Sequence, residues 1–312
     1  MPAKTRYRDF CRTAPDVPVF AQPWYLDACA EGGTWDVVLA EEKGRVVAAL
    51  PYFYKQKSLF QYATMPPFVK WLGPYLLPEF RGRLPKEHEL MQALIAQLPD
   101  LAAFKQNFYP TVTNWLPFYW QQFRQTTFYT YRLHQLRKLA RVEAGLGTGI
   151  RRDIRLARPQ VRVVHDLPLA EFYRVNMLSF QRQQLAPPYS LAQLRRLDAA
   201  LATAGNRQLF FAVDAQNRVH SVAYLIWDAT TAYFLLAGDD PALRASGAGV
   251  LLAWECIRYA SEVLGLDCFD FEGSMLPGVE RIRVRFGAVQ TPYFFVWKHN
   301  SRLFELLEKL KP

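Results

Sequence analysis

A strand, a glycine-bearing turn and a long amphipathic helix follow one another in the second half of the sequence. The apolar run Ala232–Ala237 predicts the strand, Arg244–Gly249 forms the turn, and Ala248–Leu264 has the periodicity of the helix. A helix that begins in such a turn presents unpaired backbone N–H groups and the positive end of its dipole to an anion. Gly247 and Gly249 have no Cβ to block the approach of that anion. The order predicts a pyrophosphate-type site within an α/β fold.

The rest of the second half continues the alternation of helix and strand. Helices are predicted at Gln135–Ala144, Gly149–Ala157, Leu169–Gln183, Leu191–Ala204, Val279–Phe286 and Arg302–Leu310, and strands at Val161–His165, Gln208–Asp214, Val219–Asp228, Cys268–Glu272 and Gln290–Lys298. Ser190 is a suitable N-cap for the helix that follows it. Hairpins make neighbouring strands antiparallel, whereas a helical crossover makes them parallel. The expected class is α/β (α+β) with a mixed sheet.

The chain of 312 residues is long for a single domain, and 51% of its residues are apolar, enough for two cores. In the first half, helices are predicted at Gln22–Glu31 and Lys86–Leu98, and strands at Trp35–Glu41, Arg45–Lys55 and Leu101–Asn107. An aromatic stretch then leads into a strand at Phe128–Leu133. We place the break there, which gives expected domains of residues 1–127 and 128–312.

Positive charge is concentrated in one segment. The net charge is +10, and residues 132–162 hold nine Lys and Arg residues against two acidic ones. Solvated helix faces usually mix both signs, so this segment favours a polyanionic ligand such as a nucleotide, RNA or an acidic membrane surface. Arg151, Arg152 and Arg155 lie close together on a helix and suit a phosphate-bearing acceptor. A basic surface helix without a ligand is the alternative.

Cysteine and histidine spacing gives no sign of a metal site. The four cysteines form no CxxC pair, none of the five histidines has a metal-ligand spacing, and His220 is expected in an exposed turn between strands. The N-terminal residues are polar, and no apolar run approaches the roughly 20 residues of a membrane span. We therefore expect a reduced, cytoplasmic protein without a metal or a transmembrane segment. Peripheral membrane contact and the oligomeric state stay open.

Several segments resemble the GNAT superfamily of acyltransferases. Arg244-x-x-Gly247-x-Gly249 matches its Q/R-x-x-G-x-G/A signature, with a strand before it and a helix after it. Resemblance to the FemAB-like (BioF2-like) branch is carried by Phe20–Asp27, Trp115–Trp120, Thr126–Tyr131, Ile150–Ala157, Cys268–Ser274, Pro277–Arg281 and Phe286–Ala288. Members of this branch carry two GNAT-like domains in tandem, so the resemblance implies that fold for most of the chain.

The resemblance implies an enzyme that transfers an acyl or aminoacyl group to an amine. Acetyl-CoA or another acyl-CoA is the expected co-substrate, and a cell-envelope precursor or another small molecule is the expected acceptor. Aminoacyl-tRNA is the alternative donor, although the chain lacks the long helical hairpin that some peptidoglycan enzymes of this branch use for tRNA. A non-catalytic protein that binds through residues 132–162 is the alternative from another class.

The resemblance also implies site residues. The donor would be held by Leu236, Ala237, Arg244, Ser246, Gly247, Ala248 and Gly249. Asp270 and Glu272 alternate on a strand, which places both carboxylates on one face as candidate bases, with Glu272 at the carboxyl end. An arginine partner for Asp270 and a capping role for Glu272 are the alternatives. Four aromatic residues would line an acceptor groove between the halves: Trp24, Tyr25, Tyr119 and Trp120. Each of them is also typical of a core.

Overall fold

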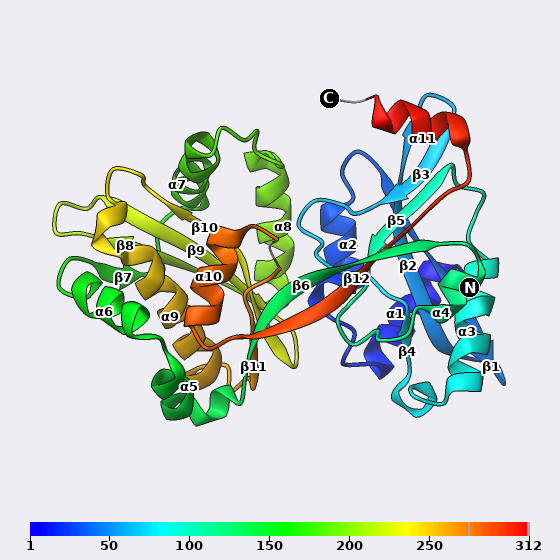
Figure 1. Cartoon of the computed structure of the whole chain (residues 1–312), viewed down its shortest axis with the longest axis horizontal. Helices are drawn as coiled ribbons and strands as arrows, with labels where there is room; N and C mark the ends of the chain where they lie inside the picture. The colour runs from blue at the N-terminus through cyan, green and yellow to red at the C-terminus, as the bar shows by residue number, and fades with distance from the viewer. Residues whose placement is uncertain (274, 311–312) are drawn as a thin grey trace. The chain divides into compact units, whose positions relative to one another are not determined.

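The structure is a computed structural model that describes residues 1–273 and 275–310 (Figure 1). Ser274, the last residue of one quoted motif, lies outside the described residues. The chain forms two compact units: Met1–Phe128 together with the segment from Pro292 on, and Tyr129–Thr291. The second unit is therefore shorter than the expected domain 128–312, because the C-terminal segment packs with the first unit.

Unit 1 is built on a mixed sheet. Its strands lie in the order β1 (Thr34–Glu42), β2 (Arg45–Lys57), β3 (Phe60–Thr64), β5 (Ala103–Asn107) and β12 (Val289–His299), with β4 (Tyr75–Leu76) paired to β2. Its helices are α1 (Ala3–Thr13), α2 (Pro23–Cys29), α3 (Leu84–Ala96), α4 (Leu116–Trp120) and α11 (Arg302–Lys309), with 3-10 turns at Val19–Ala21 and Pro78–Phe80. All the strands are antiparallel to their neighbours except β3 and β5, which are parallel.

Backbone pairing and aromatic packing hold the C-terminal segment in unit 1. Residues Phe295–His299 of β12 pair with β5. The ring of Tyr293 meets the buried ring of Trp71 edge to face, with 5.7 Å between centroids. In α11, Phe304 packs against Tyr62 at 5.0 Å. These contacts join residues more than 180 positions apart, which no local sequence pattern reports.

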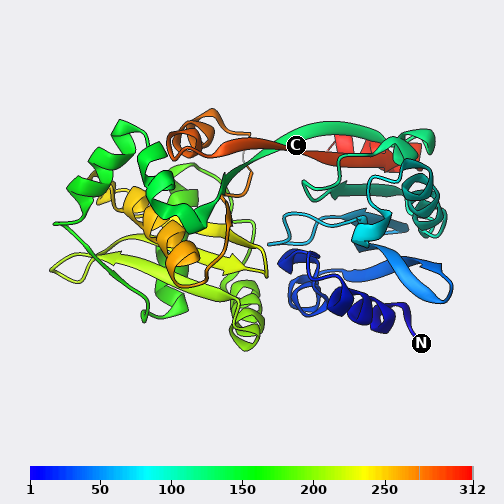
Figure 2. The same ribbon diagram turned by 90° about the horizontal axis from the view of Figure 1, so that it is seen from below.

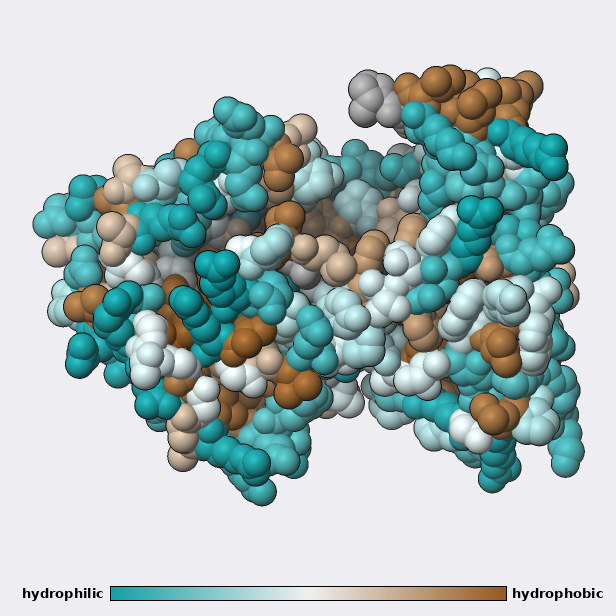
Figure 3. Space-filling model, in the orientation of Figure 1, coloured by the Kyte–Doolittle hydropathy of each residue, from teal (hydrophilic) through white to brown (hydrophobic). Residues whose placement is uncertain are grey.

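The last helix of unit 1, α11, has one buried apolar residue and several exposed ones. Phe304 is buried against the sheet, and Glu308 is bonded to Lys105 and His299. Figure 3 shows apolar side chains gathered over α11 at the surface, and the exposed ones are Leu303, Leu306, Leu307 and Leu310. The helix therefore carries a leucine stripe that unit 1 itself leaves in contact with solvent.

Unit 2 has a six-stranded mixed sheet, as expected. The strand order is β6 (Arg124–His134, of which Tyr129 onward belongs to this unit), β11 (Cys268–Asp270), β10 (Thr231–Asp239), β9 (Val219–Trp227), β8 (Arg207–Val213) and β7 (Arg162–Val164). β10 and β11 are parallel, and the other neighbours are antiparallel. The parallel pair is joined by a helical crossover, which is how such strands must be connected.

Helices cover both faces of this sheet. They are α5 (Leu139–Gly145), α6 (Thr148–Ala157), α7 (Leu169–Arg182), α8 (Leu191–Ala204), α9 (Ala248–Glu262) and α10 (Pro277–Arg285), with 3-10 turns at Leu136–Lys138 and Arg244–Ser246. Figure 2 shows α9 lying along the sheet strands. Phe210 of β8 packs with the α9 core, whereas the ring of the next residue, Phe211, faces Phe172 of α7. This alternation along a strand buries both faces of the sheet.

Helix ends agree with the capping signals of the sequence. Ser190 caps α8: its Oγ accepts the Gln193 amide, and the Gln193 side chain accepts the Ser190 amide, which completes a capping box. Several ends differ from expectation by one or more residues. Among them, α9 ends at Glu262 rather than Leu264, and β11 ends at Asp270 rather than Glu272. The second difference matters for the site described next.

Candidate functional site

Strands β10 and β11 run side by side for three residue pairs and then separate. Thr231–Tyr233 of β10 pair with the whole of β11, which ends at Asp270, while β10 continues to Asp239. The register of β10 against β9 also shifts just after Phe234, which re-aims the strand at this point. Residues that follow the last pair on both strands line a cavity of about 920 Å³. The gap leaves one edge of β10 facing this cavity.

The N-terminus of α9 closes one end of the cavity. Gly247 precedes the helix with φ +74°, in the left-handed region that favours glycine, and it lines the cavity together with Gly249. A Cβ on Gly249 would lie 2.5 Å from Asp239 Oδ1. The backbone therefore favours glycine at 247, and at 249 a larger residue would displace the neighbouring carboxylate.

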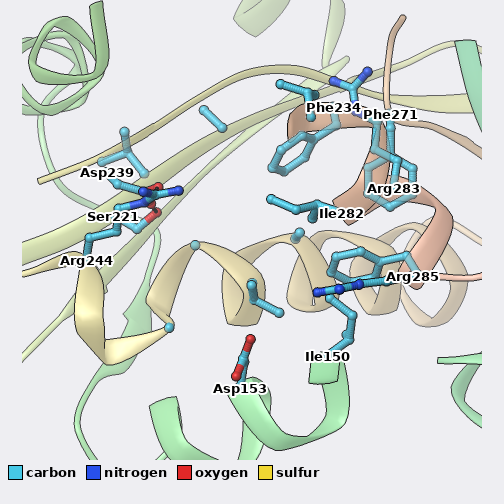
Figure 4. Close-up of a pocket in the computed structure, with 18 of the residues that line it drawn as sticks. Ile150, Asp153, Ser221, Phe234, Asp239, Arg244, Phe271, Ile282, Arg283 and Arg285 are labelled. Atoms are coloured by element: carbon cyan, nitrogen blue, oxygen red, sulfur yellow. Dashed lines mark hydrogen bonds and ion pairs between the residues drawn. The ribbon is translucent and has the colours of Figure 1, made fainter. Parts of the chain in front are cut away.

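Acidic side chains stand beside this turn. Asp239 Oδ1 accepts the hydroxyl of Ser221 at 2.7 Å, and its Oδ2 lies 3.6 Å from Nε of Arg244, which is about half exposed. Asp153, from α6, lines the cavity from the other side of the turn. Figure 4 shows Asp239, Ser221 and Arg244 together at one end of the cavity. An anion at this turn meets backbone N–H groups and one guanidinium, but two carboxylates oppose it.

The opposite part of the cavity is apolar with a basic border. Phe234, Phe271 and Ile282 point into it, and Arg283 and Arg285 come from the same helix as Ile282, α10 (Figure 4). The guanidinium of Arg283 donates to the carbonyl of Glu272, which ties α10 to the end of β11. An acyl chain and a charged group can therefore be accommodated at this end.

Glu272 lines the cavity just beyond the last residue of β11. Its backbone has φ +54°, a left-handed conformation that costs a non-glycine residue of order 1–2 kcal/mol. Asp270 stabilises this conformation, because its Oδ1 accepts the Glu272 amide at 2.8 Å. Strained backbone of this kind clusters at functional sites. The strain and the location both single out Glu272.

Asp270 occupies a different environment from the one that strand alternation predicted. It is fully buried, does not line the cavity, and accepts hydrogen bonds from Thr130 at 2.5 Å and from Arg132 Nε at 2.6 Å. Because β11 ends at Asp270, the strand alternation that would put Glu272 on the same face does not continue. The arginine-paired alternative for Asp270 is the one that the structure shows.

The expected donor-binding residues divide into two groups. Ala237, Arg244, Gly247 and Gly249 line the cavity, whereas Leu236, Ser246 and Ala248 do not. The carbonyl of Ala237 already accepts the Asn176 side-chain amide at 2.7 Å. Ser246 and Ala248 are buried behind the turn. These two can therefore support the turn but do not face the cavity.

The expected acceptor-binding residues lie elsewhere. Tyr25 is a core residue with 0% exposure whose hydroxyl donates to the Phe68 carbonyl, and Trp24 packs edge to face against it. Tyr119 and Trp120 of α4 are exposed. The three expected arginines lie on the solvent face of α6, outside the cavity: Arg151, Arg152 and Arg155. The first two already bond to the Ala144 carbonyl and to Asp153.

His220 is buried in β9, and the prediction that it lies in an exposed turn is wrong. The turn ends at Arg218 and β9 begins at Val219, so that His220 points inward with 6% exposure. Its Nδ1 lies 2.9 Å from Ser246 Oγ, and its Nε2 lies 3.1 Å from Asp214 Oδ2. The expected strand Val219–Asp228 already contained His220, and every residue of β9 from Val219 to Ile226 is buried, so a polar residue of this strand lies inside the fold.

Sequence reasoning missed the cavity residues contributed by neighbouring elements. Phe234, Asp239, Arg283 and Arg285 line the cavity, as does Asp153. Asp239 precedes the predicted turn and Arg283 lies on a helix that begins with proline, so the sequence offered a local signal for both. Their convergence depends on tertiary packing.

Two further observations concern metal ligands and membrane-spanning helices. In residues 1–273 and 275–310, no group of three or more His, Cys, Asp or Glu side chains is arranged to hold a metal ion. Over the same ranges, no helix has the length and apolar character needed to cross a membrane.

A sequence model of the acetyltransferase (GNAT) domain matches residues 135–281, a range that contains the separated strands, the turn and most of the residues that line the cavity. Residues 135–281 therefore form a GNAT domain, the type of domain that the Arg244–Gly249 signature predicted. A domain of this type supports an N-acyltransferase activity. No curated protein sequence matches the chain.

Solved structures share the fold over nearly the whole chain. The crystal structure of FemX has a TM-score of 0.73 and 12% identity, with 98% of each chain covered. A tandem GNAT protein from the clavulanic acid biosynthesis pathway has a TM-score of 0.53 and 11% identity, covering 95% of this chain and 94% of that one. The C-terminal domain of a putative lysylphosphatidylglycerol synthetase from Agrobacterium fabrum has a TM-score of 0.57 and 15% identity, covering 98% and 95%. The expected tandem, FemAB-like GNAT fold is confirmed.

Proposed function

We propose that the chain transfers an acyl group from an acyl-CoA thioester to a primary amine, with the donor in the gap between β10 and β11. The observation that carries this proposal is the separation of the two strands over a cavity that ends at the N-terminus of α9. The diphosphate of the donor would meet the turn at Gly247 and Gly249. Its pantetheine arm would follow the edge of β10 toward the apolar part at Phe234 and Ile282.

The reaction needs an oxyanion site and a base. The amine nitrogen forms a bond to the acyl carbon, the C–S bond breaks, and coenzyme A leaves as a thiol after taking a proton from solvent. Backbone N–H groups at the free edge of β10 are suited to the developing oxyanion. The proton lost by the amine passes to Glu272, the carboxylate at the carboxyl end of β11.

Substitution of Glu272 separates catalysis from stability. We expect Glu272→Gln to lower kcat by about 10²–10³-fold, because general-base catalysis contributes about 10²–10⁴-fold. Glu272→Gly should be equally inactive but about 1 kcal/mol more stable, since glycine adopts φ +54° without strain. Steady-state kinetics and urea unfolding measure the two effects. Activity retained in both variants would remove Glu272 from the mechanism.

The carboxylate of Asp239 opposes the donor phosphates in this arrangement. We expect Asp239→Asn to tighten acetyl-CoA binding about 3- to 10-fold, because one negative charge is removed beside the turn while the contact with Ser221 is kept. Isothermal titration calorimetry at low and high salt measures the gain, which should shrink as salt is added. Weaker binding would mean that Asp239 serves the donor by orienting Arg244.

Aminoacyl transfer from aminoacyl-tRNA is the second candidate, and two observations favour it. Asp153 and Asp239 give the cavity carboxylates that suit an amino group, and the exposed arginines of α6 suit an RNA backbone. The fold shared with FemX adds to this. Titration with acetyl-CoA and with charged tRNA distinguishes the candidates. Salt-sensitive tRNA binding without any CoA binding would overturn the acyl-CoA proposal.

A further inference from the structure

Three polar side chains connect the β8–β9 hairpin to the turn before α9. Asp214 follows β8, His220 lies in β9, and Ser246 ends the 3-10 turn that leads into α9. All three are at least 94% buried. The imidazole bridges the other two, with 3.1 Å from Nε2 to Asp214 Oδ2 and 2.9 Å from Nδ1 to Ser246 Oγ. None of the three lines the cavity.

The β8–β9 hairpin fixes the carboxylate of Asp214, which is one end of this series of hydrogen bonds. Asp214 Oδ1 accepts the amides of Gln216 at 3.0 Å and Arg218 at 2.8 Å, and its Oδ2 accepts Nε of Arg218 at 2.7 Å. Burial raises the pKa of Asp214, but hydrogen bonds from His220 and Arg218 outweigh burial and hold the pKa well below its usual range. Asp214 is therefore an ionised acceptor that receives the Nε2 proton of His220.

Ser246, at the other end of this series of hydrogen bonds, holds the turn. Ser246 Oγ lies 2.9 Å from His220 Nδ1 and donates its proton to the Leu243 carbonyl at 2.9 Å. Ser246 Oγ is also 3.4 Å from the amide of Ala248, the first residue of α9. The His220 carbonyl accepts the Asp240 amide at 2.9 Å, so the strand that carries the histidine also holds the segment before the turn.

These three residue types are those of a hydrolytic triad, but the environment of the serine excludes that role. Ser246 Oγ is surrounded by His220, Leu243 and Ala248, and the residue is 5% exposed. A nucleophile must reach its substrate, and this hydroxyl faces protein on the side away from the cavity. What it touches instead is the backbone of the turn.

We propose that Asp214 and His220 are positioning residues for the donor site: through Ser246 they fix the backbone amides of residues 247–249 in the arrangement that receives the donor phosphates. The proposal rests on the proposed function for the identity of the ligand. Backbone amides that are already in the binding arrangement need no reorganisation when an anion binds. The three residues therefore affect the affinity for the donor more than the rate of the chemical step.

The first test needs no ligand. Amide hydrogen exchange of the unliganded protein should show exchange at residues 244–250 accelerated about 10-fold or more in His220→Phe and Ser246→Ala, with α8 and β6 unchanged. Tyr224→Phe is the matched control, because Tyr224 is another buried residue of β9 and its hydroxyl donates to Asp198 at 2.6 Å away from the turn. Unchanged exchange at 244–250, or the same acceleration in Tyr224→Phe, would overturn the proposal.

The second test uses acetyl-CoA and S-acetylpantetheine, which lacks the diphosphate. His220→Phe and Ser246→Ala should raise the Kd of acetyl-CoA about 5- to 20-fold and leave that of S-acetylpantetheine unchanged, and His220→Asn should recover part of the loss because its amide can still reach Ser246. An equal loss for both ligands would overturn the proposal. If the unaltered protein binds neither ligand, the donor assignment fails while the exchange result still decides the role of the three residues.

Discussion

We expect Gly249→Val to abolish measurable acetyl-CoA binding and to leave the fold intact, which is the largest effect that we expect on donor binding. A Cβ at this position would lie 2.5 Å from Asp239 Oδ1 and 3.3 Å from its Cγ. The carboxylate must then move, and the valine methyl groups occupy the space where the donor phosphates would approach the first turn of α9. We expect the Kd to rise at least about 50-fold, measured by isothermal titration calorimetry.

Gly278→Val provides the matched control. Gly278 is the second residue of α10, as Gly249 is the second residue of α9, and a Cβ there meets nothing within 4 Å. Both variants carry the same loss of glycine at a helix start, so a difference between them reports the site itself. Unchanged affinity in Gly249→Val, with the helix in place, would remove the turn from the donor site.

Asp270→Ala is expected to destabilise unit 2 by about 3–5 kcal/mol, the largest effect on stability. The substitution leaves Arg132, whose side chain is 9% exposed, as a buried charge without its carboxylate, and it also removes the acceptor for Thr130 and for the Glu272 amide. Chemical unfolding followed by tryptophan fluorescence measures the loss.

An exposed ion pair gives the comparison for this prediction. Glu171→Ala breaks the pair with Arg174 on α7, which lies at the surface and should contribute less than about 1 kcal/mol. The double variant Arg132→Met/Asp270→Leu should recover much of the loss, since a well-packed apolar pair can replace a buried ion pair. If Asp270→Ala lowers the free energy of unfolding by no more than Glu171→Ala does, water reaches the Arg132 charge.

The sequence predicted those parts of the site that depend on local structure. The strand, turn and helix around Arg244–Gly249 follow from apolar periodicity and glycine placement, and all three are present. Both hairpin strands β8 and β9 also follow from the apolar runs on either side of the turn at Asn217. Ser190 was recognisable because capping is a contact between residues three positions apart.

The features that the sequence did not predict depend on long-range packing. His220 is buried because both faces of β9 are covered, and Glu272 lies outside its expected strand because β11 ends at Asp270. Asp239 and Asp153 line the same cavity although α6 lies far from β10 in sequence. Helix α1 was missed because it buries only Tyr7, Phe10 and Cys11 along a polar segment.

The return of the chain to unit 1 has a consequence for synthesis on the ribosome. β5 ends at Asn107, and its partner strand β12 follows only after all of unit 2 has been made. At about 5–20 residues per second, the intervening residues take roughly 10–40 s to translate. During this time the nascent chain exposes one edge of β5, a template for pairing with other chains. Unit 2 can complete its own sheet first, so that unit 1, although it begins the chain, is the last to close.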